Sequence, residues 1–90
     1  MLVLPAEITH EHASACCRML AQALHAQPGA AVVVDASALQ KFDSSALAVL
    51  LECRRESLAA GKTFAVARSP ARLLELASLY GVTELLPAAS

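Results

Sequence analysis

The side chains best placed to do chemistry lie in a polar segment between residues 41 and 47. Asp43, Ser44 and Ser45 are consecutive there, and an apolar run begins at Ala46. A serine hydroxyl can act as a nucleophile, accept a phosphoryl group or hydrogen-bond to a partner. If a helix begins here, its unpaired backbone N–H groups favour negative charge, including a phosphate on Ser44. Plain N-capping of that helix by Asp43 or Ser44 is the alternative interpretation.

Nucleophilic catalysis by these serines would need a base and an oxyanion hole, and the sequence offers a motif for neither. There is no Gly-x-Ser-x-Gly elbow, and no histidine lies close in sequence to Ser44 or Ser45. A glycine-rich phosphate cradle is also missing from the sequence. We therefore predict that the protein is not an enzyme, has no catalytic residues and needs no cofactor.

Metal binding is not predicted either. His10 and His12 are two residues apart, so on a helix their side chains would point in different directions. Cys16 and Cys17 are adjacent and Cys53 stands alone, which does not match the spacing of metal ligands. We interpret the three thiols as reduced core side chains of a cytoplasmic protein.

The elements that would position the polar segment include strands at residues 31–35 and 63–67. The first of these, Ala-Val-Val-Val-Asp, is apolar on both faces, which is typical of a central strand in a parallel sheet. A shorter strand, interrupted by a proline, is predicted within residues 2–8. Phe42 is expected in a connecting loop.

Apolar residues at three- and four-residue spacing predict three helices. We expect Thr9 to cap the first, Asp43 or Ser44 to begin the second and Ser69 to cap the third. The second helix is expected to point four leucines inward: Leu47, Leu50, Leu51 and Leu58. The alternation of strands and helices predicts an α/β fold, a parallel or mixed sheet with helices packed against it, in a single domain of residues 1–90.

The charge balance excludes two classes of partner. The net charge is −1 and the isoelectric point is near 6.2, so nothing attracts the protein to nucleic acid or to an anionic membrane. No apolar stretch approaches the ~18 residues that span a bilayer, so direct membrane insertion is not expected. The first residues lack the basic flank of a signal peptide, which again favours the cytoplasm.

Several motifs together resemble the STAS domain signature. One is the strand at 32–35, followed by Phe-Asp-Ser-Ser-Ala-Leu at 42–47. Others are the segment from Gly61 through the strand at 63–67, and the ending at 76–87. The resemblance covers nearly the whole chain. It implies a STAS-type fold that works by docking onto a partner protein, with the docking surface at Asp43, Ser44, Ser45 and Ala46.

Two branches of the STAS family are candidates. One is the STAS subunit of the Mla phospholipid-transport system, a cytoplasmic partner of an ABC transporter's ATPase that reaches the inner membrane through that partner. The other is the anti-sigma-factor antagonists, which bind an anti-sigma factor kinase and would be switched by phosphorylation of Ser44. Antagonists usually carry an Asp where this chain has Thr9, and a Gly where it has Ala46. The resemblance therefore favours the transporter branch.

One departure from the family concerns the sheet. Family members usually begin with a strand before the one that contains Glu7, so the first family strand is expected to be shortened or missing. An edge strand would then have unpaired backbone N–H and C=O groups, which can pair with another chain. We accordingly expect that a homodimer could form through this edge.

Overall fold

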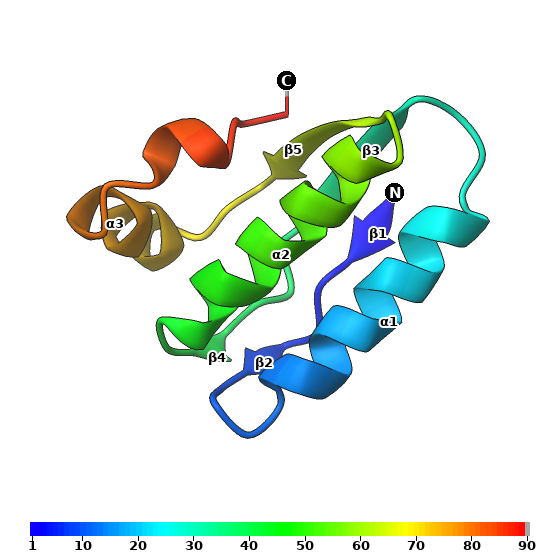
Figure 1. The fold of residues 1–90 in the computed structure, drawn as a ribbon. Coiled ribbons are helices and arrows are strands. Elements are labelled where there is room, and N and C mark those ends of the chain that lie inside the picture. The colour runs from blue at the N-terminus through cyan, green and yellow to red at the C-terminus, as the bar shows by residue number, and fades with distance from the viewer. Residues whose placement is uncertain (90) are drawn as a thin grey trace.

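The structure, a computed structural model, describes residues 1–89. It is an α/β fold in which helices pack against a small parallel sheet, as predicted (Figure 1). The elements are, in chain order, β1 (Leu2–Val3), β2 (Glu7–Ile8), α1 (Ala13–Ala26), β3 (Ala31–Asp35), β4 (Lys41–Phe42), α2 (Ser45–Ala59), β5 (Thr63–Ala67), α3 (Ala71–Leu79) and a short 3-10 helix, η1 (Thr83–Leu85). Strands β3 and β5 have the predicted bounds.

The sheet has the order β1-β3-β5, and both neighbours of β3 run parallel to it. The chain continues past a bend into a second parallel pair, β2 with β4, so Phe42 lies in a short strand and not in the expected loop. Three hydrogen bonds connect the segments between the pairs: the Leu4 N–H donates to the Asp35 carbonyl at 2.9 Å, and the Gln40 and Lys41 N–H groups donate to the Ala6 carbonyl at 2.8 and 3.0 Å. A two-residue strand is too short for its periodicity to be recognised in the sequence.

Helices α1 and α2 lie side by side over one face of the sheet, and α3 lies beyond α2 (Figure 1). Helix α1 lies on the connection from β1 to β3, and α2 lies on the connection from β3 to β5. Crossovers between parallel strands are right-handed, and both connections move across the sheet in the same direction, so both helices lie on the same face. The core between them is aliphatic. Its largest fully buried side chains include Leu4, Ile8, Leu20, Leu24 and Leu50, with Val32, Val34 and Val49.

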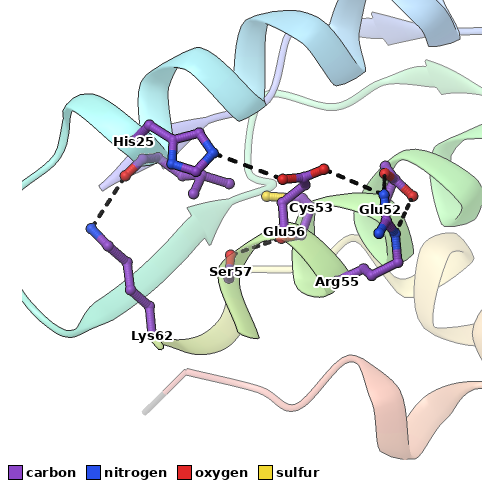
Figure 2. Close-up of polar contacts among 8 residues, drawn as sticks. His25, Glu52, Cys53, Arg55, Glu56, Ser57 and Lys62 are labelled. Atoms are coloured by element: carbon purple, nitrogen blue, oxygen red, sulfur yellow. Dashed lines mark hydrogen bonds and ion pairs between the residues drawn. The ribbon is translucent and has the colours of Figure 1, made fainter. Parts of the chain in front are cut away.

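Polar contacts join the ends of α1 and α2 (Figure 2). The Lys62 ammonium donates to the carbonyls of Leu24, at 3.2 Å, and Gln27, at 2.6 Å, which are unpaired acceptors at the end of α1. His25 Nε2 lies 3.8 Å from a carboxylate oxygen of Glu56 on α2. Lys62 lies three residues after the end of α2, so its side chain connects two segments that are distant in sequence.

The helix starts differ from those predicted. Helix α1 begins at Ala13, and Thr9 does not cap it: residues 10–12 form a turn, and the Thr9 hydroxyl lies 2.9 Å from Nδ1 of His12. Helix α3 begins at Ala71, and Ser69 makes no capping hydrogen bond. The turn at residues 10–12 delays the start of α1, and α3 begins directly after Pro70. Residue preference alone does not reveal such shifts.

The face that α2 buries is also narrower than predicted. Leu47 and Leu50 are buried, but Leu51 is only half-buried and Leu58 is 48% exposed. Ser57 takes the inward position instead, fully buried, with its hydroxyl donating to the Cys53 carbonyl at 2.7 Å. Because this bond satisfies the hydroxyl locally, a buried serine is tolerated there.

The C-terminal segment packs onto the sheet, as predicted. Val82 and Leu86 pack against the core. The Val66 N–H donates to the Pro87 carbonyl, and the Ala89 N–H donates to the Val66 carbonyl, so residues 87–89 pair with the outer edge of β5. Strand β1 lies at the opposite edge. Within residues 1–89 no helix is both long enough and apolar enough to cross a membrane.

Leu50 tests the core. Leu50→Ala should lower the free energy of unfolding by about 2 to 5 kcal/mol, because it leaves a cavity between α2 and the sheet. Leu58→Ala on the same helix is the matched control and should cost less than about 1 kcal/mol, since Leu58 is half in solvent. Urea unfolding measures both. Equal losses for the two variants would mean that the buried face of α2 is misassigned.

Candidate functional site

The predicted site lies where β4 leads into α2, at the carboxyl end of the parallel strands. Ligands and partners of open α/β sheets usually bind at this edge. Strand β4 is held by its pairing with β2, and α2 is held by its buried face. Both neighbours of the segment Asp43–Ser44 are therefore fixed to the core.

Asp43 connects two turns of the structure. Its carboxylate accepts the Ser45 N–H at 2.8 Å, at the start of α2, and the His10 N–H at 3.2 Å, in the turn before α1. Hydrogen bonding by Ser45, and then by the His10 N–H, lowers the pKa of Asp43. Asp43 thus stabilises the start of α2, as the capping hypothesis held, and it also fixes the His10 turn beside it. Sequence spacing had not linked His10 with Asp43, because they are far apart in the chain.

Ser44 is exposed and occupies the N-cap position of α2. Its hydroxyl makes no capping bond, and no other hydrogen bond of this hydroxyl occurs within residues 1–89. Ser45 is half-buried, and Ala46 is fully buried in the core. Of the four predicted residues, Ser44 is therefore the one that has an exposed hydroxyl without a hydrogen bond within residues 1–89.

Charged side chains lie on β2 and β4, in the turn before α1 and on α3. Lys41 Nζ lies 3.9 Å from a Glu7 carboxylate oxygen, and Nδ1 of His12 lies 4.0 Å from the same atom. The Arg72 guanidinium lies over the buried ring of Phe42, with its Cζ 5.5 Å from the ring centre. The two exposed ion pairs of Glu7 contribute little to stability.

The arrangement can bind, but it has no assembled catalytic group. No histidine or other base hydrogen-bonds to Ser44 among the residues that the structure describes. Over the same residues, no group of three His, Cys, Asp or Glu side chains is placed to hold a metal ion. What the segment offers is a rigid, exposed helix start with small side chains.

A second polar contact lies at the same end of the sheet. The Asp35 carboxylate, nearly buried at the end of β3, accepts two hydrogen bonds from Arg68, with Nε 3.3 Å from Oδ1. Arg68, helped by the Ser37 N–H, holds the pKa of Asp35 far below its usual range. Sequence spacing had not linked Arg68 with Asp35, because the two residues are 33 positions apart. The sequence contained one indication of this contact, because an Asp at a buried strand end needs a cation beside it.

Arg68 also has an unusual backbone. Its φ is +53°, a conformation that is uncommon for residues with a Cβ. The chain leaves β5 at this point and turns toward α3. The ion pair with Asp35 supports the strained turn and so helps to position α3.

The cysteines are structural. Cys16 and Cys53 are buried, as interpreted from the sequence, and Cys17 is half-buried. Burial raises the pKa of all three thiols, that of Cys53 to about 11. Little reactive thiolate is present at neutral pH, so these side chains are not activated nucleophiles.

Comparison with known protein families decides the assignment. The family model described as "Mlab, STAS domain" matches residues 1–87. The chain belongs to the STAS domain family. A search of curated proteins found no match. The family match confirms the resemblance carried by the motifs at 32–35 and 42–47, and STAS domains are generally non-catalytic modules.

In this STAS domain the hydrogen bonds of the Asp43 carboxylate can be tested by measuring stability as a function of pH. The folded state lowers the pKa of Asp43, so its charge stabilises the fold above the unfolded-state pKa, and this contribution is lost as the pH falls through the folded-state value. At about pH 7 the melting temperature of Asp43→Asn should therefore lie below that of the wild type. The difference between the two melting temperatures should become smaller below about pH 4.

Glu75→Gln on exposed α3 is the control, because no hydrogen bond or ion pair of Glu75 occurs within residues 1–89. It should show little difference from the wild type at either pH. Thermal unfolding followed by circular dichroism measures all three proteins. A gap for Asp43→Asn that stays constant across the pH range would contradict the assigned hydrogen bonds.

Proposed function

We propose that this STAS domain is a non-enzymatic docking module whose partner is the ATPase of an ABC transporter of the Mla phospholipid-transport type. It would act in the cytoplasm, reach the inner membrane only through that partner, and support the assembly or activity of the transporter. The observation that carries the proposal is Ser44, which is exposed at a helix start that Asp43 holds in place, with its hydroxyl free of hydrogen bonds within residues 1–89.

The chemistry of this surface suits close contact with another protein. Ser44 and Ser45 have small side chains, so a partner backbone can approach the first turn of α2. Because the net charge is only −1, affinity should come from buried contact and a few hydrogen bonds, and little from long-range attraction. A rigid site also loses little conformational entropy on binding.

Two observations favour the transporter branch. The description of the matching family model includes "Mlab". In addition, antagonists carry an acidic residue at the position of Thr9, whereas the Thr9 hydroxyl of this chain is engaged with His12. The surface next to Ser44 therefore lacks the acid that accompanies the phosphorylation switch in the other branch.

The second candidate function is that of an anti-sigma-factor antagonist. The exposure of Ser44 favours it, because a kinase must reach the hydroxyl. The Asp43 carboxylate, held beside Ser44 by the Ser45 and His10 N–H groups, does not separate the two branches, because the antagonists carry the same Asp directly before the serine that is phosphorylated.

Ser44→Arg tests the docking surface. The change places a bulky cation at the proposed contact and leaves the core untouched, so association with the ATPase should be lost with little change in melting temperature. Ala59→Arg, at the exposed far end of the same helix, is the matched control and should bind normally. Co-purification from cells that express both proteins gives the result. A folded Ser44→Arg variant that still co-purifies fully with the ATPase would place the interface elsewhere.

The phosphorylation state of Ser44 separates the two branches. In the transporter branch the unmodified hydroxyl is the working form, so intact-mass spectrometry of protein from its native cells should find Ser44 unphosphorylated. Substantial phosphate on Ser44, together with binding to a kinase that Ser44→Asp abolishes and Ser44→Ala preserves, would favour the antagonist.

A further inference from the structure

The three-stranded sheet has one covered edge and one open edge. Residues 87–89 pair with the outer edge of β5. Strand β1 lies at the opposite edge, next to α1 (Figure 1), and pairs with β3 alone. Natural proteins usually protect an edge strand with charged side chains or proline, because free backbone groups can pair with another chain. Residues 1–6 contain no charged side chain, so Pro5 is the only residue of this kind at the β1 edge.

The backbone of Val3 is the part of β1 that faces the open edge. In a strand the N–H and C=O of one residue point to the same side, and this side alternates from residue to residue. The Leu4 N–H donates to the Asp35 carbonyl on β3, so Leu2 and Leu4 face inward and Val3 faces outward. Within residues 1–89 no strand pairs with that outer side of β1. Val3 therefore offers one hydrogen-bond donor and one acceptor side by side.

This donor and acceptor are complementary to a second copy of themselves. When two antiparallel strands place the same residue opposite itself, the two residues exchange both N–H···O bonds across a twofold axis. By the same alternation Pro5 is the next residue that faces outward, and it has no N–H. A long foreign strand laid along this edge would therefore lack a donor at Pro5. The edge suits a short symmetric pairing better than the addition of a long strand.

Exposed apolar side chains lie at the same edge. Met1 and Val3 are each 59% exposed, and Met19 on α1 is 46% exposed. Met19 also lines a groove of about 230 Å³ between α1 and the segment that joins β1 to β2. The lining residues are Pro5, Glu7, His12, Ala15, Cys16 and Met19. Contact with a second copy would remove this apolar surface from water, and a net charge of only −1 gives little repulsion between copies.

We propose that two copies of this chain pair through β1, antiparallel and centred on Val3, to form one continuous sheet with three strands from each copy. The twofold axis would pass between the two Val3 residues, and Leu2 of each copy would lie opposite Leu4 of the other. The two Met19 side chains, one from each α1, would flank the axis on the helix side of the sheet. This inference does not depend on the proposed ATPase contact, because none of these residues belongs to the segment 43–46.

Val3→Pro tests the hydrogen bonds of the edge. Proline removes the outward N–H and no hydrogen bond to β3, so the monomer should still fold. The contact is small, so the wild-type dimer should have a dissociation constant of about 10 to 100 µM. Val3→Pro should raise this constant about tenfold or more, because two hydrogen bonds are lost. Sedimentation equilibrium gives the constants, since the wild-type mass should rise from 9.4 kDa toward twice that value with concentration.

Met19→Glu tests the side chains beside the axis. It would place two like charges across the axis, so it should weaken the dimer, and more strongly at low salt. Leu79→Glu, at a 79% exposed position of α3, is the matched control and should dimerise as the wild type does. Ser44→Arg should also dimerise normally. Circular dichroism verifies that each variant is folded. Folded Val3→Pro and Met19→Glu variants that both dimerise like the wild type would overturn the inference, as would a wild type that stays monomeric at about 1 mM.

Nuclear magnetic resonance defines the register. In the proposed pairing, Leu2 and Leu4 of opposite copies form a pair without hydrogen bonds, in which the facing Cα atoms lie about 4.5 Å apart. An isotope-filtered Overhauser experiment on a mixture of labelled and unlabelled protein should therefore show contacts between the Hα atoms of Leu2 and Leu4. Contacts between copies that involve only α3 or β5 would place the interface elsewhere and contradict the pairing through β1.

Discussion

Strand β3 pairs in parallel with β1 on one side and with β5 on the other, and the positions of α1 and α2 follow from this pairing. Parallel neighbours cannot be joined by a tight hairpin, so each connection must carry a crossover helix. Both crossovers step in the same direction, which places α1 and α2 on the same face. The ends of the strands then meet at one edge, where the segment after β4 becomes the exposed site.

The rigidity of that site comes from backbone hydrogen bonds to a side chain. Asp43 accepts the N–H groups of His10 and Ser45, so the turn before α1 and the start of α2 form one surface. The Ser44 hydroxyl can then remain without a hydrogen bond within residues 1–89, because Asp43 accepts the N–H group at the start of α2. The site therefore combines a fixed backbone with an uncommitted hydroxyl, which suits a docking contact.

Helix α2 contributes both to the core and to the exposed surface. One side carries Ala46, Val49, Leu50 and Cys53 into the core. The other side leaves Ala48, Arg55 and Leu58 exposed. Because one helix has both sides, a substitution on the outer side should leave the packing of the core nearly intact.

The sequence by itself determined the strands at 31–35 and 63–67, since β-branched and apolar runs between turn residues have few other stable arrangements. It also gave the family resemblance, because that depends on local motifs such as the one at 42–47. The short strand at Lys41–Phe42 was missed, because two residues have no measurable period. Helix starts were misplaced by up to a few residues, because capping preference does not reveal a turn such as the one at residues 10–12.

The tertiary structure alone decided which side chains meet. The contacts of Arg68 with Asp35 and of His10 with Asp43 each join residues 33 positions apart, and no local spacing encodes such a pair. The tertiary structure also leaves Leu51 half-buried and Leu58 exposed, because the sheet and the neighbouring helices cover only part of the surface of α2. A helical period indicates which residues share a side, but the neighbouring elements determine how much of that side is covered.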